Sequence, residues 1–143
     1  MTVAEILSLK GREVATIAPG RTIGEAVDEL ARRRIGALVV VEGRDRVAGI
    51  LSERDVVRAL AKRGVDLLAA RVDSIMTREV VTCGESETIN RVMGRMTRGR
   101  FRHLPVVENG RLAGIVSIGD VVKARIEEVE HEAEDMRTYI ATA

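Results

Sequence analysis

The sequence has very few of the residues on which most metal-binding, disulfide-stabilised and catalytic proteins depend. Of its 143 residues one is cysteine, Cys83, so no internal disulfide can form. A single free thiol fits a reducing cytosol. The two histidines, His103 and His131, have no metal-site spacing, and no Walker or Rossmann glycine loop is present. These absences predict a protein that is not an enzyme and that holds no metal and no catalytic cofactor.

Aromatic residues and net charge are also scarce. Phe101 and Tyr139 are the only aromatic residues, so a stacking surface for single-stranded bases is missing. A net charge of +1 gives no general attraction to nucleic acid or to an anionic membrane. No apolar run approaches the roughly 18 residues of a membrane helix, and residues 1–5 lack the pattern of a secretory signal. We therefore expect a cytoplasmic protein that binds neither nucleic acid nor a membrane.

The chain contains an internal repeat. Apolar residues make up 45% and charged residues 31% of the chain, as in ordinary folded domains. Residues 14–58 align with residues 80–123 across one gap in a turn, and the identical residues fall in blocks. The longest blocks are Val40-Val41-Glu42 with Val106-Val107-Glu108, Ala48-Gly49-Ile50 with Ala113-Gly114-Ile115, and Asp55-Val56-Val57 with Asp120-Val121-Val122.

Each repeat is predicted to form a strand, a helix, a hairpin and a second helix. Apolar residues recur at helical spacing over residues 22–34, and Thr22 with Glu25 forms a capping box. The hairpin of the first repeat is expected over residues 37–51, and Asn109-Gly110 is typical of the equivalent tight turn. Short leading strands are expected over residues 13–17 and 79–83, and a short helix between the repeats over residues 67–76. Two such α/β units can bury their sheets against each other around a pseudo-twofold axis.

The domain boundaries follow from the repeat. We expect an N-terminal helix and lead-in, the first repeat, a linker with a connecting helix, the second repeat and an acidic amphipathic C-terminal helix. The corresponding ranges are residues 1–13, 14–61, 62–79, 80–125 and 126–143. From Val122 to Ile140 the apolar positions step alternately by four and three, which predicts a long helix with an apolar seam. That seam can cover its own domain or pack on a second chain.

The repeated motif whose side chains could bind a ligand is Gly-apolar-x-Ser-x-x-Asp, at residues 49–55 and 114–120. Ser-x-x-Asp is by itself a capping box at the start of a helix. It also places a hydroxyl and free amides at a helix N-terminus, where an anion can bind. An aspartate one turn further can accept two hydrogen bonds from a ribose diol, as the acidic residue of dinucleotide folds does.

The doubled motif, the run at residues 102–107 and the tandem layout resemble a CBS-domain pair, also called a Bateman module. The resemblance covers residues 3 to 125 approximately. It implies tandem repeats of the CBS fold that bind AMP, ATP, NAD or another adenosine-containing ligand in clefts between the repeats, without catalysis, as part of signal transduction. It also implies a homodimer.

The resemblance carries over to site residues one position at a time. It implies ribose binding by Asp55 and Asp120 and phosphate binding by Ser52 and Ser117. It places beside the adenine, or before the hairpins, Thr16, Ala18, Thr82, Gly84, Gly36, Ala37, Arg102 and His103.

The two repeats differ in charge at these positions. Gly36-Ala37 is small and neutral, whereas Arg102-His103 brings a cation and a titratable imidazole. With Arg54, these residues favour a phosphate-bearing ligand (AMP, ATP or NAD) over S-adenosylmethionine, whose sulfonium is positive. Alternatively, Arg102 belongs to a solvated basic face with the other arginines of residues 91–100.

The predicted function is a non-catalytic regulatory module that binds an adenine nucleotide and signals through the conformation of a dimer or of a regulated protein partner. The alternative is a protein-interaction module with vestigial clefts whose C-terminal helix binds a partner. A third hypothesis, nucleic-acid binding by the arginine-rich stretch, predicts steep salt dependence.

Overall fold

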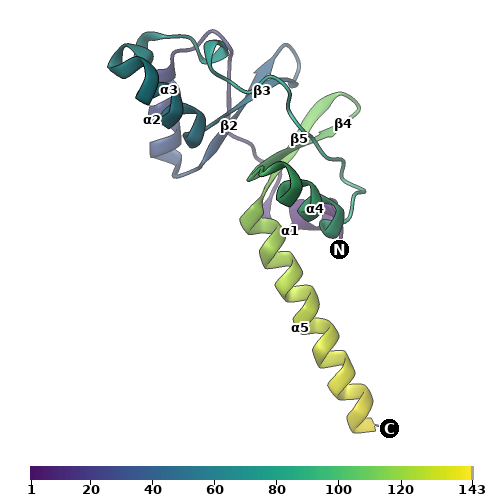
Figure 1. Cartoon of the computed structure of the whole chain (residues 1–143). Coiled ribbons are helices and arrows are strands. Elements are labelled where there is room, and N and C mark those ends of the chain that lie inside the picture. The colour runs from purple at the N-terminus through teal and green to yellow at the C-terminus, as the bar shows by residue number, and fades with distance from the viewer. Residues whose placement is uncertain (143) are drawn as a thin grey trace.

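A computed structural model describes residues 1–142 and shows two α/β units and a long protruding helix (Figure 1). The first unit contains β1 (Thr16–Ile17), α2 (Ile23–Arg33), β2 (Ala37–Glu42), β3 (Arg46–Ser52), α3 (Glu53–Arg63) and the 3-10 helices η1 (Gly64–Ala69) and η2 (Val72–Ser74). The second contains α4 (Ile89–Gly99), β4 (His103–Glu108), β5 (Arg111–Ser117) and α5 (Ile118–Thr142), and α1 (Val3–Lys10) precedes both.

The two hairpins are built alike. In the first repeat β2 lies between β1, to which it is parallel, and β3, to which it is antiparallel. In the second, β4 and β5 form an antiparallel pair. The register shifts at the same place in both hairpins, between Val40 and Val41 and between Val106 and Val107. The predicted fold class, a tandem α/β repeat of helix, hairpin and helix, is therefore confirmed, with a leading strand in the first repeat.

Two predicted elements are wrong in detail. Residues 79–83 do not form a strand; only Cys83 bridges to Val106, because the chain turns at Gly84 directly toward α4. Residues 67–76 do not form one helix but fall into η1 and η2. Gly64, with φ 69°, ends α3, and the short 3-10 turns that follow press Leu67 and Val72 into the core.

The segment that leads into each repeat packs against the other repeat. Val3, Ile6 and Leu7 of α1 belong to the hydrophobic core of the second repeat. Leu67, Val72 and Met76 of the linker belong to the core of the first. Figure 1 accordingly shows α1 beside the base of α5, and α1 also contacts β5. Because the lead-in segments cross over in this way, each carries residues to the motif of the opposite repeat.

The centre of the molecule is formed by the two hairpins. Strand β3 contacts β5, and the Leu112 amide donates to the Asp45 carbonyl at 2.9 Å. The α3 and α5 helices start at the ends of these two central strands. The fold thus brings the two Ser-x-x-Asp motifs to related positions on either side of the contact between the repeats.

Two glycines on the central strands have no room for a side chain. A Cβ on Gly49 would lie 2.7 Å from the Met76 sulfur and 2.8 Å from the Thr77 carbonyl oxygen, and one on Gly114 would lie 2.8 Å from a Leu7 methyl carbon. We expect Gly49→Ala to destabilise the fold by about 1–3 kcal/mol, as overpacking does. Gly114→Ala should cost less, because a leucine side chain can shift whereas a paired backbone carbonyl cannot. Thermal unfolding of the two variants compares them, and equal losses would contradict this explanation.

The α5 helix continues without a break from the second repeat into the acidic extension and points away from both units (Figure 1). Only Val121 and Ala124 of this helix are buried. Within residues 1–142, no helix is both long and apolar enough to cross a membrane.

Candidate functional site

Each Ser-x-x-Asp motif forms a capping box at the start of its helix. The Ser52 amide donates to Oδ2 of Asp55 at 2.9 Å, and the Asp55 amide donates to the Ser52 hydroxyl at 3.2 Å. Ser117 and Asp120 make the same two bonds at 2.8 Å and 3.1 Å. Among the described residues, Oδ1 of neither aspartate accepts a hydrogen bond. Each motif therefore caps its helix and still holds one carboxylate oxygen free for a ligand.

The residues before each hairpin meet the motif of their own repeat. The Gly36 carbonyl accepts the Glu53 amide at 2.9 Å, and the Arg102 carbonyl accepts the Ile118 amide at 2.8 Å. In the sheets, Ala37 lies opposite Ser52 and His103 lies opposite Ser117. The structure thus brings together the residues expected before the hairpins and those expected at the phosphate.

The residues expected beside the adenine lie elsewhere in their own repeat. Thr16 is on β1, separated from β3 by β2. Ala18 lies beyond it, in the turn toward α2, and accepts the Arg21 amide. The Thr82 carbonyl accepts a hydrogen bond from Arg95 at 2.8 Å, and the Gly84 amide donates to Glu87 at 2.7 Å. Within residues 1–142, no hydrogen bond joins these four residues to the Ser-x-x-Asp motif of the same repeat.

The lead-in segments reach the opposite repeat instead. Thr77 pairs with Ile50, two residues before Ser52, and residues 78–81 connect it to Thr82. Lys10 reaches Ile115 of β5, and residues 11–15 connect it to Thr16. The geometry therefore favours clefts of crossed composition, in which Thr82 accompanies the Asp55 motif and Thr16 accompanies the Asp120 motif.

A lysine occupies the second motif. The Lys10 ammonium donates to Oδ2 of Asp120 at 2.6 Å and to the Ile115 carbonyl at 3.0 Å. Burial alone would raise the pKa of Asp120, but the Lys10 and Ser117 hydrogen bonds outweigh it and lower that pKa. Asp55 forms no ion pair with any described residue. Sequence reasoning missed Lys10, because it lies far from Asp120 along the chain and outside the aligned repeat.

His103 lies at the contact between the two repeats. Its ring Cε1 is 3.2 Å from the point where a Cβ on Gly36 would stand, and Oε1 of Glu53 is equally close to that point. Burial lowers the pKa of the half-buried imidazole, and the Lys10 and Arg102 charges lower it further, whereas Asp120 and Glu53 oppose the shift. The imidazole is therefore held neutral across a surface that both repeats share.

This environment predicts a pH-dependent stability that depends on His103. The pKa of His103 is lower in the folded than in the unfolded chain. As the pH falls through about 6.5, the unfolded state therefore binds more protons than the folded state and is stabilised relative to it. Stability present at pH 7.5 should thus decline toward pH 5.5. Thermal unfolding across this range should show a larger decline for the wild type than for His103→Gln. Parallel declines would contradict the assignment.

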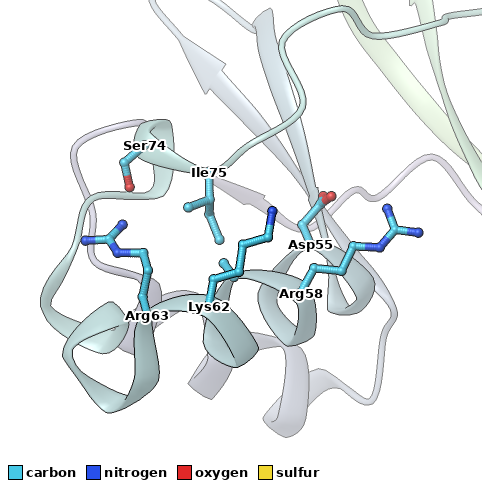
Figure 2. A pocket seen from close by; sticks show the side chains of 7 residues that line it. Asp55, Arg58, Lys62, Arg63, Ser74 and Ile75 are labelled. Atoms are coloured by element: carbon cyan, nitrogen blue, oxygen red, sulfur yellow. The ribbon is translucent and has the colours of Figure 1, made fainter.

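A pocket of about 330 Å³ lies beside Asp55, between α3 and the end of η2 (Figure 2). It is lined by Asp55, Arg58, Ala59, Lys62, Arg63, Ser74 and Ile75. The exposed Arg54, predicted as a site residue, does not line it. Arg58, Lys62 and Arg63 were missed, although their spacing along one face of the helix after Asp55 was visible in the sequence.

Neither metal binding nor thiol chemistry has a site in the part of the chain that the structure describes. No group of three histidine, cysteine or carboxylate side chains within residues 1–142 is placed to hold a metal ion. Cys83 is buried, and that burial, together with Glu87 and Glu108, raises the pKa of its thiol to about 12. The thiol is a core residue and not a nucleophile.

Comparisons with known proteins match this architecture. The CBS domain family model matches residues 3–62 and 72–127. The crystal structure of a CBS-domain containing protein from Agrobacterium tumefaciens superposes with a TM-score of 0.84 at 50% identity, and the alignment covers 87% of this chain and 99% of that one.

Two further solved structures contain adenosine compounds. A CBS domain protein from Pyrobaculum aerophilum, complexed with AMP, aligns with a TM-score of 0.75 at 30% identity over 84% of this chain and 89% of that one. The CBS domain pair of protein MJ0100, in complex with 5′-methylthioadenosine and S-adenosyl-L-methionine, aligns with a TM-score of 0.77 at 28% identity over 87% and 98%.

Proposed function

This chain belongs to the CBS-domain family, and we propose that it is a non-catalytic regulatory module that binds an adenine nucleotide between its two repeats. The observation that carries the proposal is the pair of aspartates, Asp55 and Asp120, each with a free carboxylate oxygen at the start of the helix that follows a central strand. Such an oxygen can accept a hydrogen bond from a ribose diol, as in other nucleotide-binding folds. The adenosine ligands of similar CBS domain proteins support this proposal.

The proposed site has the same parts in both repeats. The aspartates hold the ribose, and the Ser52 and Ser117 hydroxyls with the helix amides approach the phosphate. The remaining proposed contacts are the adenine-side residues Thr16, Ala18, Thr82 and Gly84, the pre-hairpin residues Gly36, Ala37, Arg102 and His103, and Arg54. The cations among them favour AMP, ATP or NAD over a positively charged sulfonium ligand.

The Asp55 cleft should fill before the Asp120 cleft as the nucleotide concentration rises. In the second cleft a ribose must displace the Lys10 ammonium from Asp120 or share the carboxylate with it. In the first cleft Asp55 carries no such partner among the described residues. The Asp55 cleft is accordingly the tighter one.

Signalling is proposed to pass through a homodimer in the cytoplasm, where the single buried Cys83 stays reduced. The exposed apolar seam of α5 supports dimerisation. A nucleotide can act on the dimer, or on a regulated protein partner, only by binding two of its conformations unequally.

Titration calorimetry of the full chain with AMP, ADP, ATP, NAD and S-adenosylmethionine tests the proposal. Binding of at least one phosphate-bearing ligand, tighter than S-adenosylmethionine, is the expected result. No binding by any of them at millimolar concentration would overturn it. The chain would then be an interaction module with vestigial clefts, whose partner is lost on removal of the chain after Lys123.

A further inference from the structure

The pocket beside Asp55 is lined with positive charge. Asp55, Arg58 and Lys62 follow one another at intervals of three and four along α3, so their side chains share one helix face. Figure 2 shows Lys62 and Arg63 rising from α3 toward the segment that holds Ser74 and Ile75. Asp55 stands at the other end of the same hollow. The pocket thus extends along α3 from the aspartate that is proposed to bind the ribose.

These cations are not used by the fold. None of Arg58, Lys62 and Arg63 makes an ion pair or a side-chain hydrogen bond with another described residue. Some other arginines are paired, for example Arg33 with Glu29 at 2.8 Å and Arg71 with Asp73 at 2.9 Å, and what distinguishes the pocket is that its unpaired cations lie together on one surface. Several unpaired cations around one concave surface repel one another, and an anion bound among them removes that repulsion.

The second repeat supplies an internal comparison. At the positions equivalent to Lys62 and Arg63 it carries Glu127 and Glu128, and at the position of Arg58 it keeps a cation, Lys123. Glu128 is bound to the chain N-terminus at 3.0 Å and to Arg125 at 2.9 Å. The repeats share their fold and their capping aspartates, yet the charge at this end of the cleft is reversed. The basic pocket is therefore a property of the first cleft and not of the repeat.

We propose that Arg58, Lys62 and Arg63 form a subsite for the phosphates beyond the first one of a nucleoside di- or triphosphate whose ribose binds Asp55. The inference rests on the proposed nucleotide-binding function and adds the class of ligand that the first cleft prefers. At about 1.5 Å of rise per residue, Arg58 lies about 4.5 Å and Lys62 about 10.5 Å beyond Asp55 along the helix axis, so a longer phosphate chain reaches more of these cations. The guanidinium groups bind phosphate oxygens in pairs, and the ammonium acts as a point charge.

Calorimetry with adenosine, AMP, ADP, ATP and inorganic triphosphate tests the subsite on the full chain. The wild type should bind ATP more tightly than ADP, and ADP more tightly than AMP. Lys62→Glu with Arg63→Glu copies the second repeat and should weaken ATP binding about tenfold or more, while AMP changes less than about threefold. Lys62→Gln with Arg63→Gln should give an intermediate loss without introducing new charge.

Arg44→Glu with Arg46→Glu is the matched control. It makes the same change in net charge on exposed residues of the β2–β3 hairpin and should leave the ATP preference unchanged. Equal binding of AMP and ATP by the wild type, or equal ATP loss in the control, would overturn the subsite. So would a pocket variant that changes the oligomeric state but not ATP affinity.

The phosphate subsite and the adenosine site can be tested separately. If AMP binds and responds to Asp55→Ala but ATP shows no advantage, the subsite is wrong and the nucleotide module stands. If inorganic triphosphate binds and is lost in the pocket variant while AMP and adenosine do not bind, the anion subsite stands and the adenosine site is wrong. If no ligand binds, both are wrong.

Discussion

A variant carrying both Asp55→Ala and Asp120→Ala is expected to bind no adenine nucleotide at millimolar concentration. Hydrogen bonds to a charged group contribute about 1.5–3 kcal/mol each, so losing the carboxylate that receives a ribose diol costs about 3 kcal/mol or more. A loss of that size lowers affinity by about a hundredfold or more at each cleft. Calorimetry of the double variant measures it.

The single variants separate the clefts. Asp55→Ala should remove the tighter site and leave a weak one, because Lys10 competes for Asp120. Asp120→Ala should leave the tight site nearly unchanged. A Lys10→Met variant, which frees the Asp120 carboxylate, should bring the two sites closer in affinity. The reverse order of loss in the single variants would contradict the role given to Lys10.

Both aspartates also cap their helices, so stability must be controlled. Thr22→Ala removes an equivalent cap, since the Thr22 hydroxyl accepts the Glu25 amide at 3.1 Å at the start of α2. Losing a cap costs about 1 kcal/mol. This control should unfold at a similarly lowered temperature and still bind nucleotide. If it lost binding as the aspartate variants do, destabilisation and not ribose recognition would explain the result.

The local features of the fold were predictable because each depends on residues that are close together in the sequence. Ser52 and Asp55 are three residues apart and form the complete capping box that this spacing indicates. Thr22 and Glu25 have the same spacing but form only half of the predicted box, because the Glu25 carboxylate accepts the Thr22 hydroxyl and not the Thr22 amide. The Asn109-Gly110 turn has positive φ at both residues, as its sequence predicts. The doubling of these local patterns was sufficient to give the fold class.

The features that failed depend on contacts between distant segments. Nothing in residues 3–10 indicates that α1 joins the core of the second repeat, because its apolar residues would suit either core. Residues 79–83 have the composition of a strand, but the turn that follows limits their pairing to Cys83. Lys10 reaches Asp120 only through the exchange of lead-in segments. Sequence periodicity shows which face of an element is buried, but not which partner buries it.

The exposed seam of α5 predicts that the dimer depends on this helix. Val122, Ile126, Val129, Met136 and Ile140 are 43% to 67% exposed, although they follow the spacing of a coiled-coil seam. Val121 and Ala124, on another face, already hold the start of α5 against the second repeat. Residues 130–142 are exposed throughout, and an isolated helix of that length is marginal in water. A second copy of the seam buries these side chains and stabilises the extension.

Charges beside the seam favour a parallel arrangement of the two copies. With Ile126 at position a and Val129 at position d, Arg125 and Glu132 occupy successive g positions. In a parallel pair they face Glu130 and Arg137, at the e positions of the other copy. Both contacts are between opposite charges.

The apolar residues Val57 and Leu60 of α3, 65% and 40% exposed, are also available to a partner.

Val129→Asp with Met136→Asp is therefore expected to convert a dimer to a monomer in analytical ultracentrifugation, because two charges per chain would be buried in the seam without partners. His131→Asp with Thr138→Asp, on the outer face of the same helix, should leave the dimer intact. Arg137→Glu should weaken a parallel pair, and adding Glu132→Arg should restore it. Such a restoration supports the parallel arrangement, because residues 132 and 137 of the two copies need not face each other in an antiparallel pair. If the wild type were a monomer at micromolar concentration, the signal of a bound nucleotide would have to pass through the repeats themselves or a different protein partner.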